Sequence, residues 1–218
     1  MLPTYKCIPN KRRTKMKIEF WEDYFKDDST FLFGSNPNKT IIEYEHLFQK
    51  EWNILDVGCG DGKIAIHLAK QGYEHIDAFD ISETAIEKVN RLCSKSNLKI
   101  NTSVTPISDF KFEKKYDLML SFGVFHFISK EEWKCFIKKA KASTNIGGIH
   151  IIQLFNDSIA PTPDIAPYAI GMAKDGEIKE LYEDWEIIEY LSYAFNDEHP
   201  GVPLHQHASN KLVARKIK

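Results

Sequence analysis

The segment that most restricts how this chain can fold is DVGCGDG, at residues 56–62. The apolar run WNILDVG at 52–58 leads into it and predicts a buried strand. KIAIHLAKQ at 63–71 follows it with the apolar spacing of a helix. Glycines between a strand and a helix allow a tight turn and a close approach of the backbone to a ligand. The segment therefore predicts an α/β fold with a ligand-binding loop at the end of a strand.

Strands and helices alternate along the chain after this segment. We expect strands at 75–82, 99–107, 116–123 and 147–155, with helices at 83–94 and 130–143. Such alternation predicts a doubly wound, Rossmann-like parallel sheet with helices on both faces. Two more strands, at 185–195 and 210–218, are expected as an antiparallel pair appended to this sheet. The segments 156–175 and 196–207 are expected as loops.

Length and composition bound the domain organisation and the partners. A chain of 218 residues suits one domain, since domains have roughly 100–200 residues. We expect a single domain over 1–218, with an aromatic N-terminal segment (1–50), a cofactor-binding core (51–155) and substrate-side loops with closing strands (156–218). The net charge of −2 favours neither nucleic acid nor an anionic membrane as a partner. The expected assembly is a monomer or a homodimer.

The N-terminus and the cysteines bear on the compartment. No apolar run approaches the ~18–20 residues of a membrane span, and the first residues lack the apolar stretch of a secretory signal. Cys7, Cys59, Cys93 and Cys135 are scattered, without a CxxC pair. We therefore expect a cytoplasmic protein with free thiols.

The ligand is predicted from the acidic residues around the glycines. Asp80 ends the second predicted strand, where doubly wound folds hold the ribose hydroxyls of a nucleoside. The glycine spacing is GxGxG rather than the GxGxxG of dinucleotide sites. Asp56 and Asp61 would repel a pyrophosphate but suit an ammonium or sulfonium charge. These features disfavour a nicotinamide-dependent oxidoreductase, which stays as an alternative.

LDVGCGDG together with FDIS at 79–82 resembles motifs I and II of the class I S-adenosylmethionine-dependent methyltransferases. The aromatic segment 20–38, the stretch GEIKELYEDWE at 176–186 and the final KLVARK are similar to the tellurite-resistance and thiopurine methyltransferases within that class. The resemblance implies a seven-stranded sheet whose last strand is antiparallel. It also implies S-adenosylmethionine as cofactor.

The resemblance assigns roles residue by residue. It implies cofactor contacts in the glycine loop, at the end of the second strand, in the Ser-Asp-Phe segment after the third, in the segment after the fourth and in the aromatic lid: Asp56, Gly58, Cys59, Gly60, Asp80, Ile81, Asp109, Phe110, Ser121, Val124, Trp21 and Tyr24. Asp80 would hold the ribose, Ile81 would flank the adenine and Asp109 would contact its amine. Phe125 would face the substrate.

Histidines are the candidates for catalysis or metal binding. His126 lies in the segment that borders the transferred methyl group in the family, so it is a candidate base, with packing at a strand end as an equal alternative. His199, His205 and His207 cluster near the C-terminus, and residues two apart on a strand point the same way. They are candidates for substrate contacts or for a zinc-like ion. Exposed polar loop residues are the favoured alternative to a metal site.

Methyl transfer from a sulfonium is an in-line displacement that needs alignment and a dry site. A thiol or a chalcogen anion needs little help from a base, whereas an oxygen or nitrogen nucleophile often needs one. The resemblance to the tellurite-resistance group implies a small-molecule methyltransferase for a thiol or chalcogen oxyanion, with O- or N-methylation of a small metabolite as the alternative. A non-enzymatic protein that senses metal or a metabolite through its histidines is a third possibility.

Overall fold

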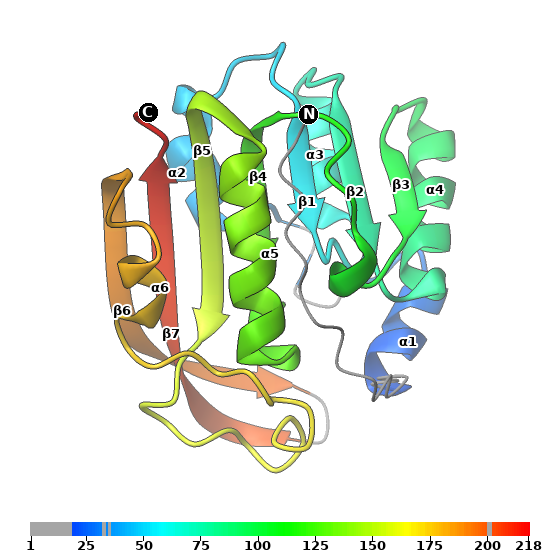
Figure 1. Cartoon of the computed structure of the whole chain (residues 1–218). Coiled ribbons are helices and arrows are strands. Elements are labelled where there is room, and N and C mark those ends of the chain that lie inside the picture. The colour runs from blue at the N-terminus through cyan, green and yellow to red at the C-terminus, as the bar shows by residue number, and fades with distance from the viewer. Residues whose placement is uncertain (1–18, 32–33, 35, 200–201) are drawn as a thin grey trace. The chain divides into compact units, whose positions relative to one another are not determined.

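The computed structural model describes residues 19–31, 34, 36–199 and 202–218, with side chains from residue 21 onward, apart from those of residues 199 and 202. The chain forms two compact units, whose boundary lies between Met119 and Leu120. Figure 1 labels the helices and strands of both units.

The strands form one seven-stranded sheet in the order β3-β2-β1-β4-β5-β7-β6. β1 pairs with β2 and β2 with β3 in parallel, while β7 pairs antiparallel with both β5 and β6. The predicted fold class and the antiparallel last strand are therefore confirmed. The strands are β1 (Ile54–Val57), β2 (Ile76–Asp80), β3 (Asn101–Val104), β4 (Tyr116–Phe122), β5 (Thr144–Phe155), β6 (Glu186–His199) and β7 (Val202–Arg215).

The N-terminal unit packs four helices with β1, β2 and β3. They are α1 (Glu19–Lys26), α2 (Lys39–Tyr44), α3 (Lys63–Lys70) and α4 (Glu83–Ser96). α4 begins at Ser82, whose side chain accepts a hydrogen bond from the Ala85 amide, and ends at Asn97 in the left-handed conformation. α1 lies beside α4 (Figure 1). All four residues of β1 are buried, as its apolar composition predicts.

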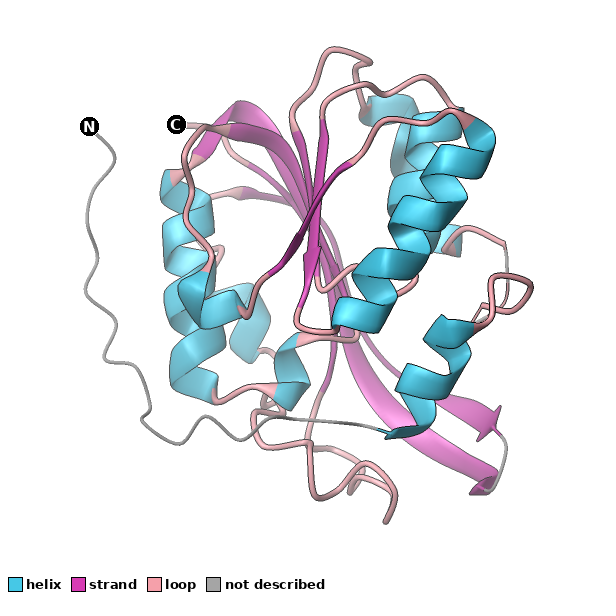
Figure 2. Ribbon diagram, turned by 90° about the vertical axis from the view of Figure 1, so that its right-hand side faces the viewer, coloured by secondary structure: helices cyan, strands magenta, loops and turns pink. Residues whose placement is uncertain are grey.

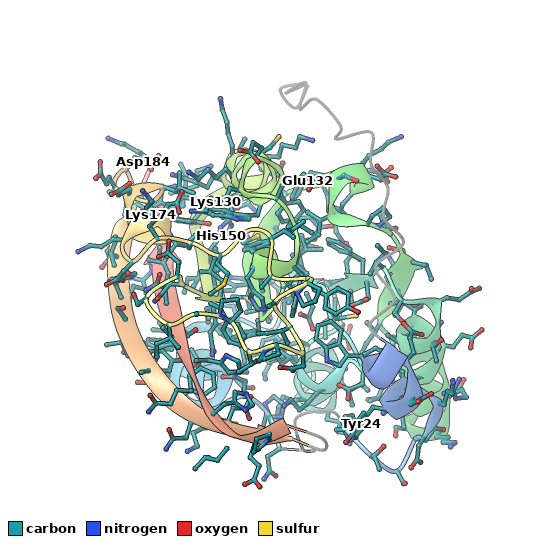
Figure 3. All side chains as sticks on the ribbon, turned by 90° about the horizontal axis from the view of Figure 1, so that it is seen from below. Tyr24, Lys130, Glu132, His150, Lys174 and Asp184 are labelled. Carbon is teal, nitrogen blue, oxygen red and sulfur yellow. The ribbon has the colours of Figure 1, made fainter. Side chains whose placement is uncertain are left out.

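The C-terminal unit contains α5 (Lys130–Ala142) and the short α6 (Glu177–Glu180). A capping box between Ser129 and Glu132 starts α5. At the start of α6, Glu177 Oε2 accepts hydrogen bonds from the Lys130 ammonium at 2.8 Å and from the Lys174 amide at 2.7 Å. Figure 3 shows Lys130 and Lys174 near each other at this junction.

The buried polar core of this unit is a chain of hydrogen bonds. The Thr144 hydroxyl donates to the Ala140 carbonyl at 2.7 Å and so accepts from His150 Nε2 at 2.8 Å. His150 Nδ1 then accepts from the Tyr182 hydroxyl at 2.7 Å. Burial lowers the pKa of His150 to about 3, so its imidazole is neutral. His150 (labelled in Figure 3) is therefore a satisfied core residue.

The segment 156–175 is a loop, as expected, with an isolated bridge between Asn156 and Ala173. The expected loop at 196–207 is wrong. β6 continues to His199 and β7 begins at Val202, so most of this segment is an extended hairpin, drawn as two long ribbons in Figure 2. The Asn, Asp, Pro and Gly residues indicated a loop, but alternate side chains here face a covered side of the hairpin, and that burial favours strands.

The expectation of free thiols is confirmed in part. Cys59 and Cys93 are free. Cys135 is disulfide-bonded, which contradicts the expectation, and Cys7 lies outside the described residues. In the part of the chain that the structure describes, no helix has the length and apolar character needed to cross a membrane.

Candidate functional site

The loop after β1 has the backbone conformation that its glycines predict. Gly58, Gly60 and Gly62 have φ values of 63°, 51° and 73°, in the left-handed region that favours glycine. The Cys59 amide donates to the Phe79 carbonyl at 3.0 Å, which ties the loop to β2. Burial raises the pKa of the Cys59 thiol well above its usual value, so it stays a thiol rather than a reactive thiolate.

Asp80 joins the end of β2 to this loop. Its Oδ2 accepts a hydrogen bond from the Gly60 amide at 2.9 Å, and its Oδ1 accepts one from the Ser82 amide at 2.9 Å. Each carboxylate oxygen can accept a further hydrogen bond. Burial raises the pKa of Asp80, and these amide donors oppose the rise. The side chain is therefore held in place with acceptor capacity to spare for ligand hydroxyls.

Further carboxylates surround the loop. Asp56 is 3% exposed, and its Oδ2 has no hydrogen-bond partner among the described residues. Burial raises the pKa of Asp56 to about 7, and the charges of Asp80 and Asp61 add to the rise. Glu22 of α1 in turn helps to raise the pKa of Asp80. This concentration of negative charge suits a cationic ligand group and opposes a phosphate.

The aromatic N-terminal segment covers the loop. The Phe25 ring lies 3.8 Å from the point that a Cβ on Gly60 would occupy. Trp21 and Tyr24 are half-buried on the same helix. Phe25 thus packs against the glycine loop, and the role of this segment as a lid stays a prediction. The side chain of Phe20 lies outside the described residues.

Lys88 fastens this segment to α4, and sequence analysis missed it. Its ammonium group is fully buried and donates to the carbonyls of Tyr24 (at 3.1 Å) and Thr30. It also lies 3.9 Å from Asp61 Oδ2. The sequence did contain a signal for this contact, because Lys88 lies on the apolar face of an amphipathic helix. A lysine buried there needs hydrogen-bond partners from another segment.

Two apolar surfaces adjoin the end of β2. Ile81 is 51% exposed, directly after Asp80. The ring of Phe110, which directly follows Ile107–Asp109, stacks on the ring of Phe79 in β2, with 4.3 Å between the ring centroids. This contact holds the turn against the sheet. Asp109 itself is exposed. Ile81 and Asp109 are thus accessible to a ligand, whereas Phe110 has a packing role as well.

The segment after β4 belongs to the C-terminal unit and is mostly core. Ser121 is buried, and its hydroxyl has no hydrogen-bond partner among the described residues. Val124 is half-buried. Phe125 is 0% exposed and stacks with Trp133 of α5 at 6.4 Å. Core packing therefore accounts for Phe125 better than a substrate contact does.

His126 is 1% exposed and packs face to face with Phe155 at 4.2 Å. Its Nδ1 accepts a hydrogen bond from the Phe155 amide at 3.4 Å, so Nε2 carries the proton of the neutral ring. Burial lowers the pKa of His126 to about 3. An imidazole of such low basicity, with its lone pair engaged, is a poor proton acceptor near neutral pH.

The C-terminal histidines lie on the hairpin. His205 and His207 come together with Asp197, which faces them from β6. The side chain of His199 lies outside the described residues. The structure thus brings together two of the three histidines that the sequence singled out, with an aspartate from the neighbouring strand.

Comparisons with known proteins identify the family. A family model described as tellurite resistance protein TehB matches residues 22–200. The chain belongs to the TehB family. It is 34% identical over 172 residues to the probable S-adenosyl-L-methionine-dependent methyltransferase TehB of Haemophilus influenzae, and the match covers 78% of this chain. The match covers 57% of that relative, so the chain spans little more than half of its length.

Solved structures agree with the fold. The crystal structure of TehB from Haemophilus influenzae superposes with a TM-score of 0.74 at 27% identity, covering 90% of this chain and 67% of that one. A structure of coclaurine N-methyltransferase bound to N-methylheliamine and SAH superposes with a TM-score of 0.64 at 15% identity, over 88% of this chain and 76% of that one. At that identity the second likeness supports the fold alone.

Proposed function

We propose that this member of the TehB family is an S-adenosylmethionine-dependent methyltransferase that acts on a small molecule. The observation that carries the proposal is the set of carboxylates around the glycine loop. Asp56, Asp61 and Asp80 approach one another closely enough to raise the pKa of Asp56. Such a set suits the ammonium and sulfonium groups of this cofactor and opposes the pyrophosphate of a dinucleotide.

The residues present fit the cofactor. Asp56 Oδ2, which has no hydrogen-bond partner among the residues that the structure describes, offers a buried acceptor. The left-handed glycines leave room for close backbone approach. Asp80 would accept hydrogen bonds from the ribose hydroxyls, Ile81 would lie against the adenine and Asp109 would contact its amine. Asp56, Gly58, Cys59 and Gly60 would line the methionine part.

When bound, the cofactor supplies an electrophilic methyl group on a sulfonium sulfur. The chain then acts by orientation and by exclusion of water. Asp80 fixes the loop through the Gly60 amide, and Lys88 fastens the segment that carries Phe25 over it. Phe25 would shield the loop from solvent, with Trp21 and Tyr24 beside it on α1.

The acceptor is proposed to be a soft nucleophile, either a thiol or a chalcogen oxyanion. His126 was the candidate base, and its pKa of about 3 makes it a weak one. A soft nucleophile needs little base assistance, so this weakness favours it over a hydroxyl or an amine. The family description, tellurite resistance, points the same way. O- or N-methylation of a small metabolite is the second candidate.

Calorimetric titration with S-adenosylhomocysteine, run beside NADH, tests the cofactor. We expect micromolar binding of the first ligand and none of the second. Binding of NADH alone would instead support the oxidoreductase alternative. A methyl-transfer assay with thiols, selenite and tellurite against phenols and amines then tests the acceptor. Transfer to phenols or amines alone would replace the soft acceptor by the second candidate. Cofactor binding without transfer to any acceptor would favour the non-enzymatic sensor.

Asp56 predicts a pH dependence of stability in the cofactor-free protein. Its folded pKa of about 7 lies above its usual value of 3.8, so between these pH values the folded state binds more protons than the unfolded state. The free energy of unfolding should therefore fall as pH rises from about 4 to 7 and level off above, by at most about 1.4 kcal/mol per pH unit.

Asp56→Asn should flatten this fall, measured by denaturant unfolding at several pH values from 5 to 8. Asp157→Asn, at an exposed aspartate, is the matched control and should keep the slope of the unsubstituted protein. Equal slopes in the Asp56 variant and the unsubstituted protein would show that Asp56 is ionised throughout this range.

Four further statements stay predictions: the cytoplasmic location, the absence of a nucleic-acid partner, the single domain and the oligomeric state.

A further inference from the structure

Three potential metal ligands share one face of the β6–β7 hairpin. Asp197 is the cross-strand partner of His205, and His207 follows two residues later, opposite Phe195. Directly paired and alternate residues of an antiparallel pair point to the same side. Asp197 and His205 are half-buried and His207 is 5% exposed, whereas Asn196 and Gln206 between them are exposed. The three side chains therefore converge on the covered face of the hairpin.

Their ligand atoms are spaced as a metal would need. His205 Nε2 lies 2.9 Å from His207 Nε2, and His207 Nε2 lies 3.8 Å from Asp197 Oδ2. Each of the three residues offers a ligand atom within 4.8 Å of those of the other two. Ligand atoms of a tetrahedral zinc, each about 2.0–2.1 Å from the metal, are roughly 3.3 Å apart. The two separations that involve His207 Nε2 bracket that value, and the third is at most 4.8 Å, so small side-chain shifts would bring the ligands to metal-binding distances.

The hydrogen bonding of His205 selects the tautomer that binds metals. Its Nδ1 lies 2.8 Å from the Pro203 carbonyl oxygen, which can only accept, so Nδ1 carries the proton. Nε2 then presents its lone pair to the cluster and accepts a hydrogen bond from His207 Nε2. Metal-binding histidines usually donate their other ring N–H to a backbone carbonyl or a carboxylate in this way.

Aromatic packing holds the second imidazole. The His207 ring stacks on the Phe155 ring, with 4.4 Å between the ring centroids and an interplanar angle of 14°. The centroid of the Phe195 ring, on the neighbouring strand, lies 5.6 Å from that of His207. These contacts restrict the rotation of the ring. His207 Nε2 donates its proton to His205 Nε2. A metal ion would replace this proton and bind the lone pairs of both nitrogens.

We propose that Asp197, His205 and His207 form a binding site for a divalent first-row transition metal. Two imidazoles and one carboxylate are a ligand set of zinc and of non-haem iron sites, with the remaining coordination left to water. The imidazoles disfavour Mg²⁺ and Ca²⁺, which prefer oxygen ligands. The site lies on a single hairpin of the C-terminal unit, and the observations that support it do not depend on the proposed methyl transfer.

Calorimetric titration of the untagged full chain with Zn²⁺ tests the site, and the visible absorption of bound Co²⁺ reports its geometry. We expect one ion per chain. His205→Ala, His207→Ala and Asp197→Asn should each weaken binding by about 100-fold or more, since loss of even an outer-shell partner costs 10–100-fold. His75→Ala, at an exposed histidine of the N-terminal unit, is the matched control and should bind as the unsubstituted chain does. Mg²⁺ should give no heat.

Zn²⁺ should also raise the Tm of the unsubstituted chain and of His75→Ala, but not that of Asp197→Asn, because a ligand of the folded state stabilises it. Asp197→Asn changes the volume little, and its circular dichroism verifies that it folds. Absence of stoichiometric binding in the unsubstituted chain, or equal binding in the ligand variants, would overturn the proposal. S-adenosylhomocysteine binding, measured on the same samples, separates this failure from a failure of the proposed function.

Discussion

Asp80→Ala is expected to weaken S-adenosylhomocysteine binding by at least about 100-fold, because each charge-assisted hydrogen bond to a ribose hydroxyl contributes about 1.5–3 kcal/mol and every 1.4 kcal/mol is tenfold. The substitution has a second effect. The Gly60 amide loses its partner at 2.9 Å, and the glycine loop loses its attachment to the end of β2. Both losses act on the same ligand, so the effect should exceed that of an ordinary surface contact.

The measurement is a titration of the variant beside two controls. Asp80→Asn keeps the shape and one acceptor oxygen, so it should bind with intermediate affinity. Glu87→Ala removes an exposed carboxylate from the adjacent helix α4 and should bind as the unsubstituted chain does. Unchanged binding in Asp80→Ala, with its fold intact by circular dichroism, would mean that the cofactor does not lie at this strand end.

The parts of the fold that the sequence predicts are those that local chemistry determines. The burial of β1 follows from its apolar run, and the start of α4 follows from the capping hydroxyl of Ser82. The contact between Asp80 and Gly60 follows from topology, because the ends of adjacent parallel strands meet at one edge of the sheet. The alternation that predicts the parallel sheet thus also predicts that the end of β2 meets the glycine loop.

The sequence predicts the antiparallel pair itself, but not its extension through residues 196–207, because residue types and burial give opposite signals there. Asn196 and Pro203 are turn residues by composition, yet they lie in strands whose other face is covered. The alternation that marks a strand is carried by Phe195, Asp197 and His207, and two of these are polar. A hydrophobicity pattern does not register a polar residue that is buried by a partner on the next strand.

The sequence also does not predict which residues surround His126 and Lys88. His126 could be placed at the end of β4 from the sequence, but not stacked on Phe155, which is far along the chain. Lys88 could be placed on α4, but its carbonyl partners come from an N-terminal segment outside the predicted core. In both cases the decisive contact is long-range, and no local pattern encodes it.

Gly171→Ala should be the most destabilising of the substitutions considered, although nothing in the sequence around it suggests so. The Gly171 amide donates to the His126 carbonyl at 3.1 Å, and its carbonyl accepts from the buried Trp133 indole at 2.9 Å. A Cβ at this position would lie 1.7 Å from the Ile128 carbonyl oxygen. The loop 156–175 would have to move away from α5, and the Trp133 N–H would lose its partner.

Overpacking costs about 1–3 kcal/mol and an unsatisfied buried donor about 1–3 kcal/mol, so the free energy of unfolding should fall by about 2–6 kcal/mol. Gly147→Ala is the matched control, because Gly147 has a φ of 84° with nothing within 4 Å of its Cβ position. Its backbone strain alone should cost about 1–2 kcal/mol. Denaturant unfolding of both variants, followed by tryptophan fluorescence, compares the two costs. A smaller loss for Gly171→Ala than for Gly147→Ala would mean that the loop relaxes around the added methyl group, and that its docking against Ile128 contributes little to the stability of this unit.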